Sequence, residues 1–177
     1  MQFPNYIPIA DVRSTEVADV VIRQFLQYNL FQRLATMPYI TNIEKKWICF
    51  QLLFGLNKLH NIGICHGNIN FDNILLLSNL TPYLSDISVY KYAYLKKNDI
   101  RTYTYFFANK YRMELDPIYL APERFIDGEV NYSYKTTPEM DIFSMGVVIS
   151  QIFLECNLLT MSDMFDYKNG KTRKRTI

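Results

Sequence analysis

The first part of the chain alternates between short apolar runs and polar breaks. The runs from Pro4 to Ile9 and from Val17 to Phe25 have the length and composition of strands. The polar residues Arg13-Ser14-Thr15 between them are typical of a turn. Beyond the two predicted strands, apolar residues at helical spacing predict a short helix over residues 29–36, which stops near Pro38.

A second, longer helix is predicted to start at Thr41 or Asn42. Thr41 is a plausible N-cap and Glu44 lies in the first turn, where a carboxylate favours a helix start. The helix is predicted to end before Asn61-Ile62-Gly63, because glycine is a natural C-terminal stop. Apolar residues cover much of its circumference, which is typical of a buried helix. They are Ile43, Trp47, Ile48, Phe50, Leu52, Phe54 and Leu59.

The rest of the chain mixes strand, irregular and helical patterns. Residues 74–77 and 83–85 predict a short hairpin, and an irregular region rich in aromatic residues follows from 89 to 119. A strong apolar period predicts a helix from Pro138 to about Leu154. The polar, basic tail over residues 168–177 is expected to fray. The pattern predicts an α+β fold.

Composition limits the class of protein. With 177 residues, 49% hydrophobic and 20% charged, the chain is long and apolar enough for one globular domain. A net charge of +2 gives no argument for a nucleic-acid or membrane partner. The tyrosines between Tyr90 and Tyr119 lack interleaved basic residues, so packing is favoured over base stacking on RNA. We therefore expect no nucleic-acid partner.

The cysteines and the start of the chain indicate a compartment. Cys49, Cys65 and Cys156 are odd in number and lie in apolar runs, which favours free thiols in a reducing, cytoplasmic environment. The start of the chain has no secretory pattern, and no run of about 18 apolar residues predicts a transmembrane segment. Gln2 gives no N-myristoylation signal for this start site.

Three short motifs carry the candidate chemistry. His66-Gly67-Asn68-Ile69-Asn70-Phe71-Asp72-Asn73 comes first, and Asp86-Ile87-Ser88 begins 13 positions after Asn73. Ala121-Pro122-Glu123 follows later. Each motif alone is weak evidence. Together, their order and spacing follow the catalytic loop, the metal-binding loop and the end of the activation segment of protein kinases. The sequence therefore predicts a protein-kinase-like fold.

The motif residues divide into retained and substituted functions. In kinases a catalytic-loop aspartate accepts the proton of the acceptor hydroxyl, and two further residues hold magnesium at ATP. Asn68 stands at the position of that catalytic base; its amide can orient a hydroxyl but cannot take its proton. Asn70 stands at the position of the loop lysine. Asn73 and Asp86 keep oxygen ligands for magnesium, so ATP and magnesium remain candidate cofactors.

Further motif residues are predicted to be structural. We expect His66 to support the loop backbone and Asp141, on the predicted last helix, to accept backbone N–H groups from the catalytic loop. Gly67 replaces an arginine that binds activation-segment phosphate in many kinases. Glu123 is expected to belong to a buried ion pair whose arginine lies beyond residue 177, which would leave it unpaired at a cost in stability.

The residues around the motifs resemble one kinase family. Outside the motifs, the likeness is carried mainly by Ile22-Arg23-Gln24-Phe25, Asn29 to Leu34, Pro38-Tyr39-Ile40, Asn42 to Gln51, Tyr105-Phe106-Phe107, Tyr119 to Phe125, Met140 to Gly146 and Tyr167 to Gly170. These segments are similar to the vacuolar-protein-sorting regulatory serine/threonine-kinase subunits of the class III phosphatidylinositol 3-kinase complex. The resemblance runs from about Phe3 to Gly170.

The resemblance implies a role and a domain layout. It implies a kinase-fold subunit that binds the lipid-kinase catalytic subunit and supports phosphatidylinositol 3-phosphate production in vacuolar or endosomal sorting and autophagy. The location it implies is cytoplasmic, peripheral to endosomal or vacuolar membranes through partners. The layout is one partial kinase domain over 1–177: about 1–28 is a remnant of the small lobe and hinge, and about 29–170 is the large lobe.

The chain departs from the family at its catalytic positions. The family usually has an aspartate and a lysine where this chain has Asn68 and Asn70, and no Gly-rich ATP-binding loop precedes His66. These departures predict a pseudokinase that works by binding a protein partner. Two alternatives stay open: a weakly active ATP-dependent serine/threonine kinase, and a fragment without independent function whose exposed strand edges would promote aggregation.

Overall fold

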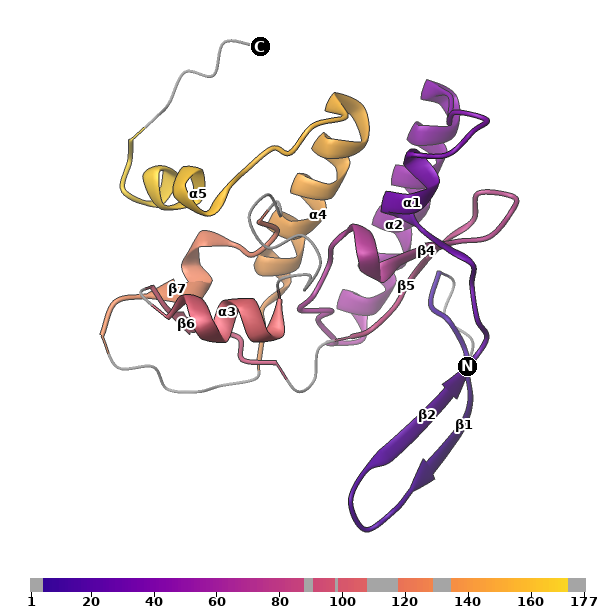
Figure 1. Cartoon of the computed structure of the whole chain (residues 1–177), viewed down its shortest axis with the longest axis horizontal. Coiled ribbons are helices and arrows are strands. Elements are labelled where there is room, and N and C mark those ends of the chain that lie inside the picture. Colours follow the sequence, from indigo (N-terminus) through magenta and orange to yellow (C-terminus); the bar gives the residue numbers. More distant parts are fainter. Residues whose placement is uncertain (1–4, 88–90, 98, 108–117, 129–134, 172–177) are drawn as a thin grey trace. The chain divides into compact units, whose positions relative to one another are not determined.

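The computed structural model describes residues 5–87, 91–97, 99–107, 118–128 and 135–171 (Figure 1). The chain forms two compact units, and each is described by itself. The first comprises Met1–Ile64 and Phe71–Asp86, and the second comprises Cys65–Asn70 and Ile87–Ile177. Helices and small sheets occur in both, so the predicted α+β class is confirmed.

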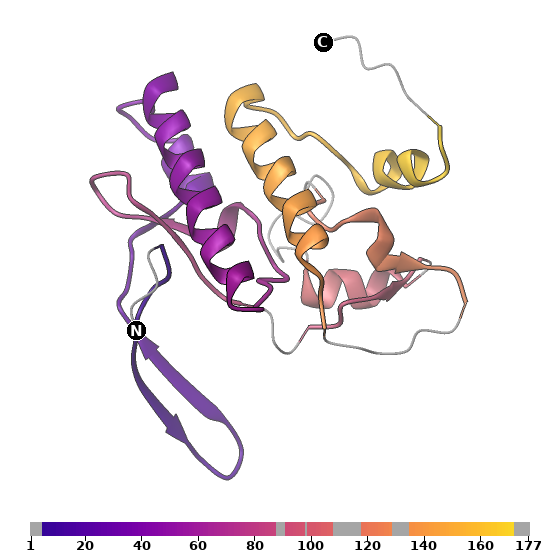
Figure 2. The same ribbon diagram turned by 180° about the vertical axis from the view of Figure 1, so that it is seen from behind.

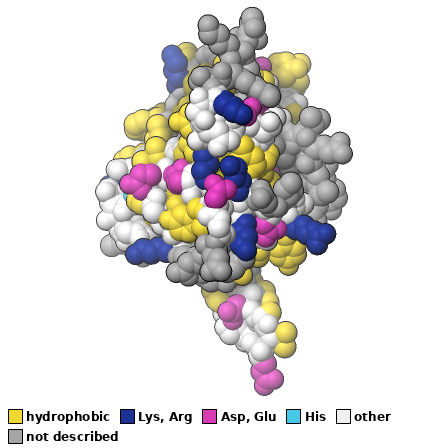
Figure 3. Space-filling view, turned by 90° about the vertical axis from the view of Figure 1, so that its left-hand side faces the viewer, with side chains coloured by type: hydrophobic (Ala, Val, Ile, Leu, Met, Phe, Trp, Pro, Cys, Tyr) yellow, Lys and Arg dark blue, Asp and Glu magenta, His cyan; other side chains and the backbone are white. Residues whose placement is uncertain are grey.

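A β-hairpin opens the first unit. β1 (Ile9–Ser14) and β2 (Asp19–Arg23) pair antiparallel, and the Thr15 hydroxyl closes the turn by bonding the backbone of Ala18. The predicted first strand was wrong, because β1 begins at Ile9 where that strand was expected to end. Every residue of both strands is exposed, so no buried face sets their bounds. The hairpin projects at the bottom of Figure 3 with hydrophobic side chains on its open surface.

A three-stranded antiparallel sheet lies in the body of the first unit. Its order is β3 (Tyr28–Asn29), β4 (Ile74–Leu76) and β5 (Pro82–Leu84), so the predicted hairpin is confirmed and gains a third strand. A 3-10 turn, η1 (Phe71–Asn73), leads into β4. α1 (Leu30–Leu34) follows β3 directly and is shorter than predicted; the Asn29 side chain caps it.

The helix α2 (Asn42–Asn61) begins and ends where the sequence predicts (Figure 2). Thr41 and Glu44 form a reciprocal capping box, and the hydrogen bonds from Thr41 lower the pKa of the Glu44 carboxyl. The sequence predicted a buried helix, and this is wrong for a large part of its surface. One stripe is buried and includes Ile48, Leu52 and Leu56, but several large apolar residues are exposed. They are Ile43, Trp47, Phe50, Leu53 and Phe54.

The segment before β1 is fixed between α2 and β5. The Asn5 side chain donates to the Pro82 carbonyl at 2.9 Å, and the Asn5 carbonyl accepts from Leu84 N–H at 2.8 Å. Asn5 lies so close to α2 that a Cβ added at Gly55 would be 2.9 Å from the Asn5 Cβ. Glycine at this helix position therefore allows the close approach.

The described part of the second unit contains three α-helices and a short parallel sheet. β6 (Leu95–Lys96) pairs with β7 (Phe125–Ile126), which follows a 3-10 turn, η2 (Pro122–Arg124). α4 (Pro138–Leu154) confirms the predicted helix. α3 (Ile100–Phe106) lies in the region predicted to be irregular, and α5 (Met161–Lys168) was not predicted. Of the predicted tail, residues 172–177 lie outside the described residues, as does Ser88.

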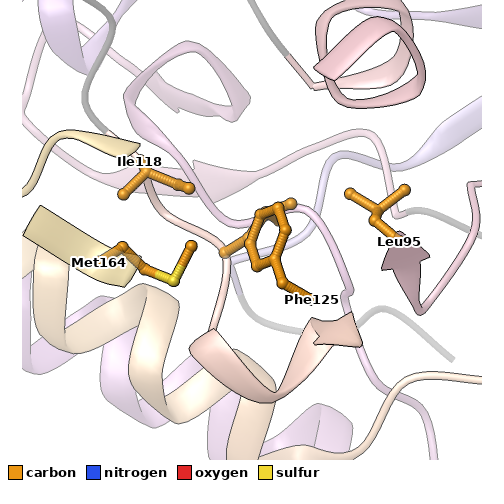
Figure 4. Packing of buried hydrophobic residues seen from close by; sticks show 5 residues of the cluster. Leu95, Ile118, Phe125 and Met164 are labelled. Atoms are coloured by element: carbon orange, nitrogen blue, oxygen red, sulfur yellow. The ribbon is translucent and has the colours of Figure 1, made fainter. Parts of the chain in front are cut away.

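Aromatic and aliphatic side chains form a core around β6, β7 and α5. Its buried members include Leu95, Ile118, Phe125 and Met164, and the Phe125 ring lies among the other three in Figure 4. Tyr103 and Phe107 pack against this cluster. In this part of the aromatic-rich region, the described side chains therefore pack as the sequence predicts. Among the described residues, no helix combines the length and the apolar character that a membrane span requires.

Candidate active site

The first half of the motif loop belongs to the second unit and is fixed by Asp141. The backbone N–H of His66 donates to one Asp141 carboxylate oxygen at 2.6 Å, and that of Gly67 donates to the other at 2.7 Å. Asp141 lies on α4 and is 1% exposed. Gly67 has φ of 72°, a left-handed conformation that strains residues with a side chain. The contacts support the predicted anchoring role of Asp141.

A buried arginine holds the same loop from the other side. The guanidinium of Arg124, which is 1% exposed, donates to the carbonyls of Gly67 at 2.9 Å, Ala93 at 2.8 Å and Tyr92 at 2.9 Å. It also lies over the Phe107 ring, 4.9 Å from the centroid. Three backbone carbonyls from two segments are therefore satisfied by one side chain.

The charge of Arg124 is balanced within the second unit. Burial lowers the pKa of Arg124 to about 10, and the nearby Asp141 and Glu123 carboxylates oppose this shift. Arg124 therefore stays charged near neutral pH. The Glu123 side chain is itself exposed, so the predicted cost of an unpaired buried carboxylate does not arise. The buried charged residue in this part of the chain is Arg124, which directly follows Glu123.

Two neutral amides occupy the positions where kinases have charged groups. The Nδ2 of Asn70 donates to the Asn68 side-chain oxygen and to the Asn68 carbonyl, both at 3.2 Å. The Asn68 N–H donates to Nδ1 of the fully buried His66 at 3.3 Å. Asn68 is 6% exposed. An amide oxygen held by an amide donor is a poor proton acceptor, so this arrangement orients groups without supplying a base.

Asn73 and Asp86, the two candidate metal ligands, belong to the first unit. Ser85 links the two residues: its N–H donates to the Asn73 carbonyl at 2.9 Å, and its hydroxyl lies 3.1 Å from that carbonyl and 2.9 Å from Asp86 Oδ2, either of which can accept its one proton. Asp86 has φ of 61°, a left-handed conformation that aspartate tolerates better than most residues. The two candidate metal ligands are thus tied together through one serine.

Arg23, at the end of β2, pairs with the same Asp86 oxygen. Its Nη2 lies 3.2 Å from Asp86 Oδ2, and the two side chains are 33% and 47% exposed. Oδ2 therefore already has a hydroxyl and a guanidinium as partners. None of the described residues donates to the other oxygen, Oδ1.

Comparison with known proteins decides the family. A model of the protein kinase domain matches residues 1–176. The chain belongs to the protein kinase domain family. It is 39% identical over 166 residues to "Serine/threonine-protein kinase vps15" of Schizosaccharomyces pombe, covering 93% of this chain and 10% of that relative.

Two further relatives are also VPS15 kinases. VPS15 of Saccharomyces cerevisiae is 38% identical over 96% of this chain, and VPS15 of Arabidopsis thaliana is 35% identical over 97%. The chain spans 12% of the length of each. The resemblance predicted from the sequence is confirmed: this kinase-fold chain is similar to the VPS15 kinases.

The side-chain oxygens of Asp86 and Asn73 are of the chemical type that binds magnesium. Protein kinase domains generally bind ATP with magnesium, and Mg²⁺ prefers carboxylate and amide oxygens such as those of Asp86 and Asn73. When bound, the ion neutralises charge on the transferring phosphate. The Ser85 hydroxyl and the Arg23 guanidinium both contact Oδ2 of Asp86. Asp86 and Asn73 thus offer oxygen donors of the kind that the ion prefers, and Arg23 already contacts one of the Asp86 oxygens.

Sequence reasoning missed the two arginines that contact the motif loops. Arg124 directly follows the Ala-Pro-Glu motif, and Arg23 ends a strand 63 residues before Asp86. A lone arginine in a strand or turn is most often exposed and solvated, so composition gave no signal. One signal for Arg124 was present: Gly67 stands where many kinases have an arginine, so the loop lacks that guanidinium, and Arg124 contacts the loop at Gly67 instead.

Proposed function

We propose that this chain is a catalytically impaired, kinase-fold regulatory subunit that binds a lipid-kinase catalytic subunit of the class III phosphatidylinositol 3-kinase type. In this role it supports phosphatidylinositol 3-phosphate production in vacuolar or endosomal sorting and autophagy. The observation that carries the impairment is the Asn68 amide, which stands at the base position and accepts from Asn70 at 3.2 Å. The similarity to VPS15 kinases supports the choice of partner.

The same proposal includes a domain layout and residue roles. Residues from about 1 to 28 correspond to the small lobe and hinge, and those from about 29 to 170 to the large lobe. His66 and Asp141 act structurally. Asn73 and Asp86 would hold magnesium if nucleotide binds. The protein works in the cytoplasm and reaches endosomal or vacuolar membranes through its partners.

An exposed aromatic stripe on α2 supports a protein partner. Trp47 and Phe50 stack with ring centroids 5.6 Å apart, and Phe50 and Phe54 stack at 6.3 Å. All three rings are between 43% and 58% exposed. Lys58 lies over Phe54 at 5.3 Å and extends the stripe with a positive charge. Contiguous exposed aromatic residues are typical of interface centres.

Co-purification of the full chain with the lipid-kinase catalytic subunit tests the proposal. We expect the wild-type chain to form a complex that survives size-exclusion chromatography, and Phe50→Ser to weaken it at least about tenfold. Phe25→Ser is the matched control, because Phe25 is also an exposed phenylalanine of the first unit, 85% exposed, but lies off α2. Failure of the folded wild-type chain to bind would contradict the proposal.

The second candidate is a weakly active ATP-dependent serine/threonine kinase. The link from Asn73 through Ser85 to Asp86 favours it, because the metal-ligand half of the site is organised. Phosphoryl transfer depends mainly on positioning and electrostatics, so a neutral base position does not abolish it in principle. Under this alternative, Asn68→Asp raises the transfer rate by about 10²-fold or more. An unchanged rate argues against it.

A further inference from the structure

We propose that Arg23 is an internal competitor of the divalent cation at Asp86. The guanidinium occupies one of the two carboxylate oxygens that the ion would use, so metal binding at that oxygen, Oδ2, requires Arg23 to move away. This inference concerns the metal-ligand half of the site and does not depend on the proposed lipid-kinase partner. It assigns Arg23 a function that neither the motifs nor the family match provides.

The contact is specific in geometry. Arg23 Nη2 and the Ser85 hydroxyl both approach Asp86 Oδ2, at 3.2 and 2.9 Å. A carboxylate oxygen offers two lone-pair directions, and these two donors use them. A cation at Oδ2 would therefore displace one donor. Ser85 is held by its backbone N–H, which donates to the Asn73 carbonyl at 2.9 Å, so Arg23 is the donor that leaves.

The charge of Arg23 adds to the competition. A guanidinium 3.2 Å from Oδ2 repels a divalent cation at the same carboxylate. Arg23 already neutralises Asp86 in the absence of metal, which lowers the gain from binding an ion. Both side chains are partly exposed, so the contact is weak and displacement is easy. The expected effect on metal affinity is therefore modest and reversible.

The contact differs from an ordinary surface ion pair on the same hairpin. Arg13 pairs with Asp11 at 2.9 Å, two residues away on the same strand, as proximity along the chain alone allows. Arg23 and Asp86 are 63 residues apart, so the fold brings them together. Arg23 is the last residue of β2, and its register opposite Ile9 places it at the open end of the hairpin. The fold thus places the positively charged Arg23 side chain against the Asp86 carboxylate, which stands at the metal-ligand position of the kinase motif.

Binding of Mn²⁺ alone to the full chain, measured by electron paramagnetic resonance without nucleotide, tests the inference. We expect Arg23→Met to bind Mn²⁺ about three- to tenfold more tightly than wild type. Arg13→Met, the matched control on the same hairpin, should leave the affinity unchanged. Asp86→Ala combined with Arg23→Met should abolish the gain. Arg23→Lys, which keeps the charge, should stay close to wild type.

Three results would overturn the inference: equal Mn²⁺ affinity in wild type and Arg23→Met, weaker binding in Arg23→Met, or no binding in either. Circular dichroism and thermal melting on each variant confirm that the compared chains are folded. Lipid-kinase co-purification with Arg23→Met separates this test from the proposed function. Complex formation without a change in metal affinity refutes the role of Arg23 alone.

Discussion

Arg124 in the second unit and Arg23 in the first show how differently the same type of side chain acts beside two of the motif segments. Arg124 is 1% exposed and satisfies three backbone carbonyls. Arg23 has a side chain 33% exposed and contacts one carboxylate oxygen. The first interaction fixes the path of the loop, whereas the second can be exchanged for another cation.

The contacts that hold the motif loop are distinct from the residue at the reacting position of a kinase. Asp141 and Arg124 hold the loop that contains Asn68, although Asn68 no longer offers a base. The loop backbone is thus held by buried charged residues, while the residue at the catalytic-base position, Asn68, is neutral.

The largest expected effect comes from Asp141→Ala. The change leaves two buried N–H groups without an acceptor and removes a carboxylate near the buried Arg124. We expect a loss of about 3–5 kcal/mol in the free energy of unfolding, measured by urea denaturation. Asp11→Ala, which breaks an exposed ion pair, is the control. If both variants lost equally little, burial would not distinguish the two regions.

Arg124→Met is expected to cost about 2–4 kcal/mol, because the carbonyls of Gly67, Ala93 and Tyr92 lose their donor. Urea denaturation measures it. Arg124→Lys should recover only part of the loss, since one ammonium cannot reproduce the guanidinium geometry. A Met variant as stable as wild type would show that the loop does not need this contact.

The first unit also has a buried titratable group, the Cys49 thiol, which can be compared with the buried Arg124 of the second unit. Burial raises the pKa of the Cys49 thiol from 9.0 to about 11. Because the folded protein holds the thiol proton more tightly than the unfolded chain, its stabilising contribution is fully present below the unfolded pKa of about 9. The contribution to the free energy of unfolding is lost as the pH rises from about 9 to 11. We expect roughly 1–2 kcal/mol less stabilisation at pH 10.5 than at pH 7.5, relative to Cys49→Ala in urea titrations. A pH-independent difference between the two proteins would rule this out.

The smallest effect on folding is expected for Arg23→Met. An ion pair between partly exposed side chains contributes little, so the free energy of unfolding should change by less than about 1 kcal/mol. Arg13→Met should behave similarly. Chemical denaturation of the two arginine variants, beside Arg124→Met, measures the contrast directly. A loss for Arg23→Met as large as for Arg124→Met would refute the division into exchangeable and architectural arginines.

Elements with strong local signals could be predicted from the sequence. The Thr41–Glu44 capping box and the apolar period of residues 138–154 define α2 and α4. Motif order gave the kinase fold. β1 was misplaced because both of its faces are exposed and no burial pattern sets its bounds. The short helices α3 and α5 lack enough turns for a clear period.

The candidate site was predictable in its motif residues but not in their partners. Asn68, Asn70, Asn73 and Asp86 were found because their spacing is fixed within a family. Arg124 and Arg23 act through contacts between residues far apart in the chain, which spacing does not encode. Exposure of Trp47, Phe50 and Phe54 was also missed, since an apolar stripe reads the same whether a core or a partner covers it.

Phosphoryl transfer from magnesium-ATP to a protein substrate, compared between wild type and Asp86→Ala, tests the central claim most directly. The account predicts that wild type transfers no more phosphate than Asp86→Ala, because the base position holds the neutral Asn68 amide. Robust transfer by wild type that is lost in Asp86→Ala would contradict the account and establish the chain as an active kinase.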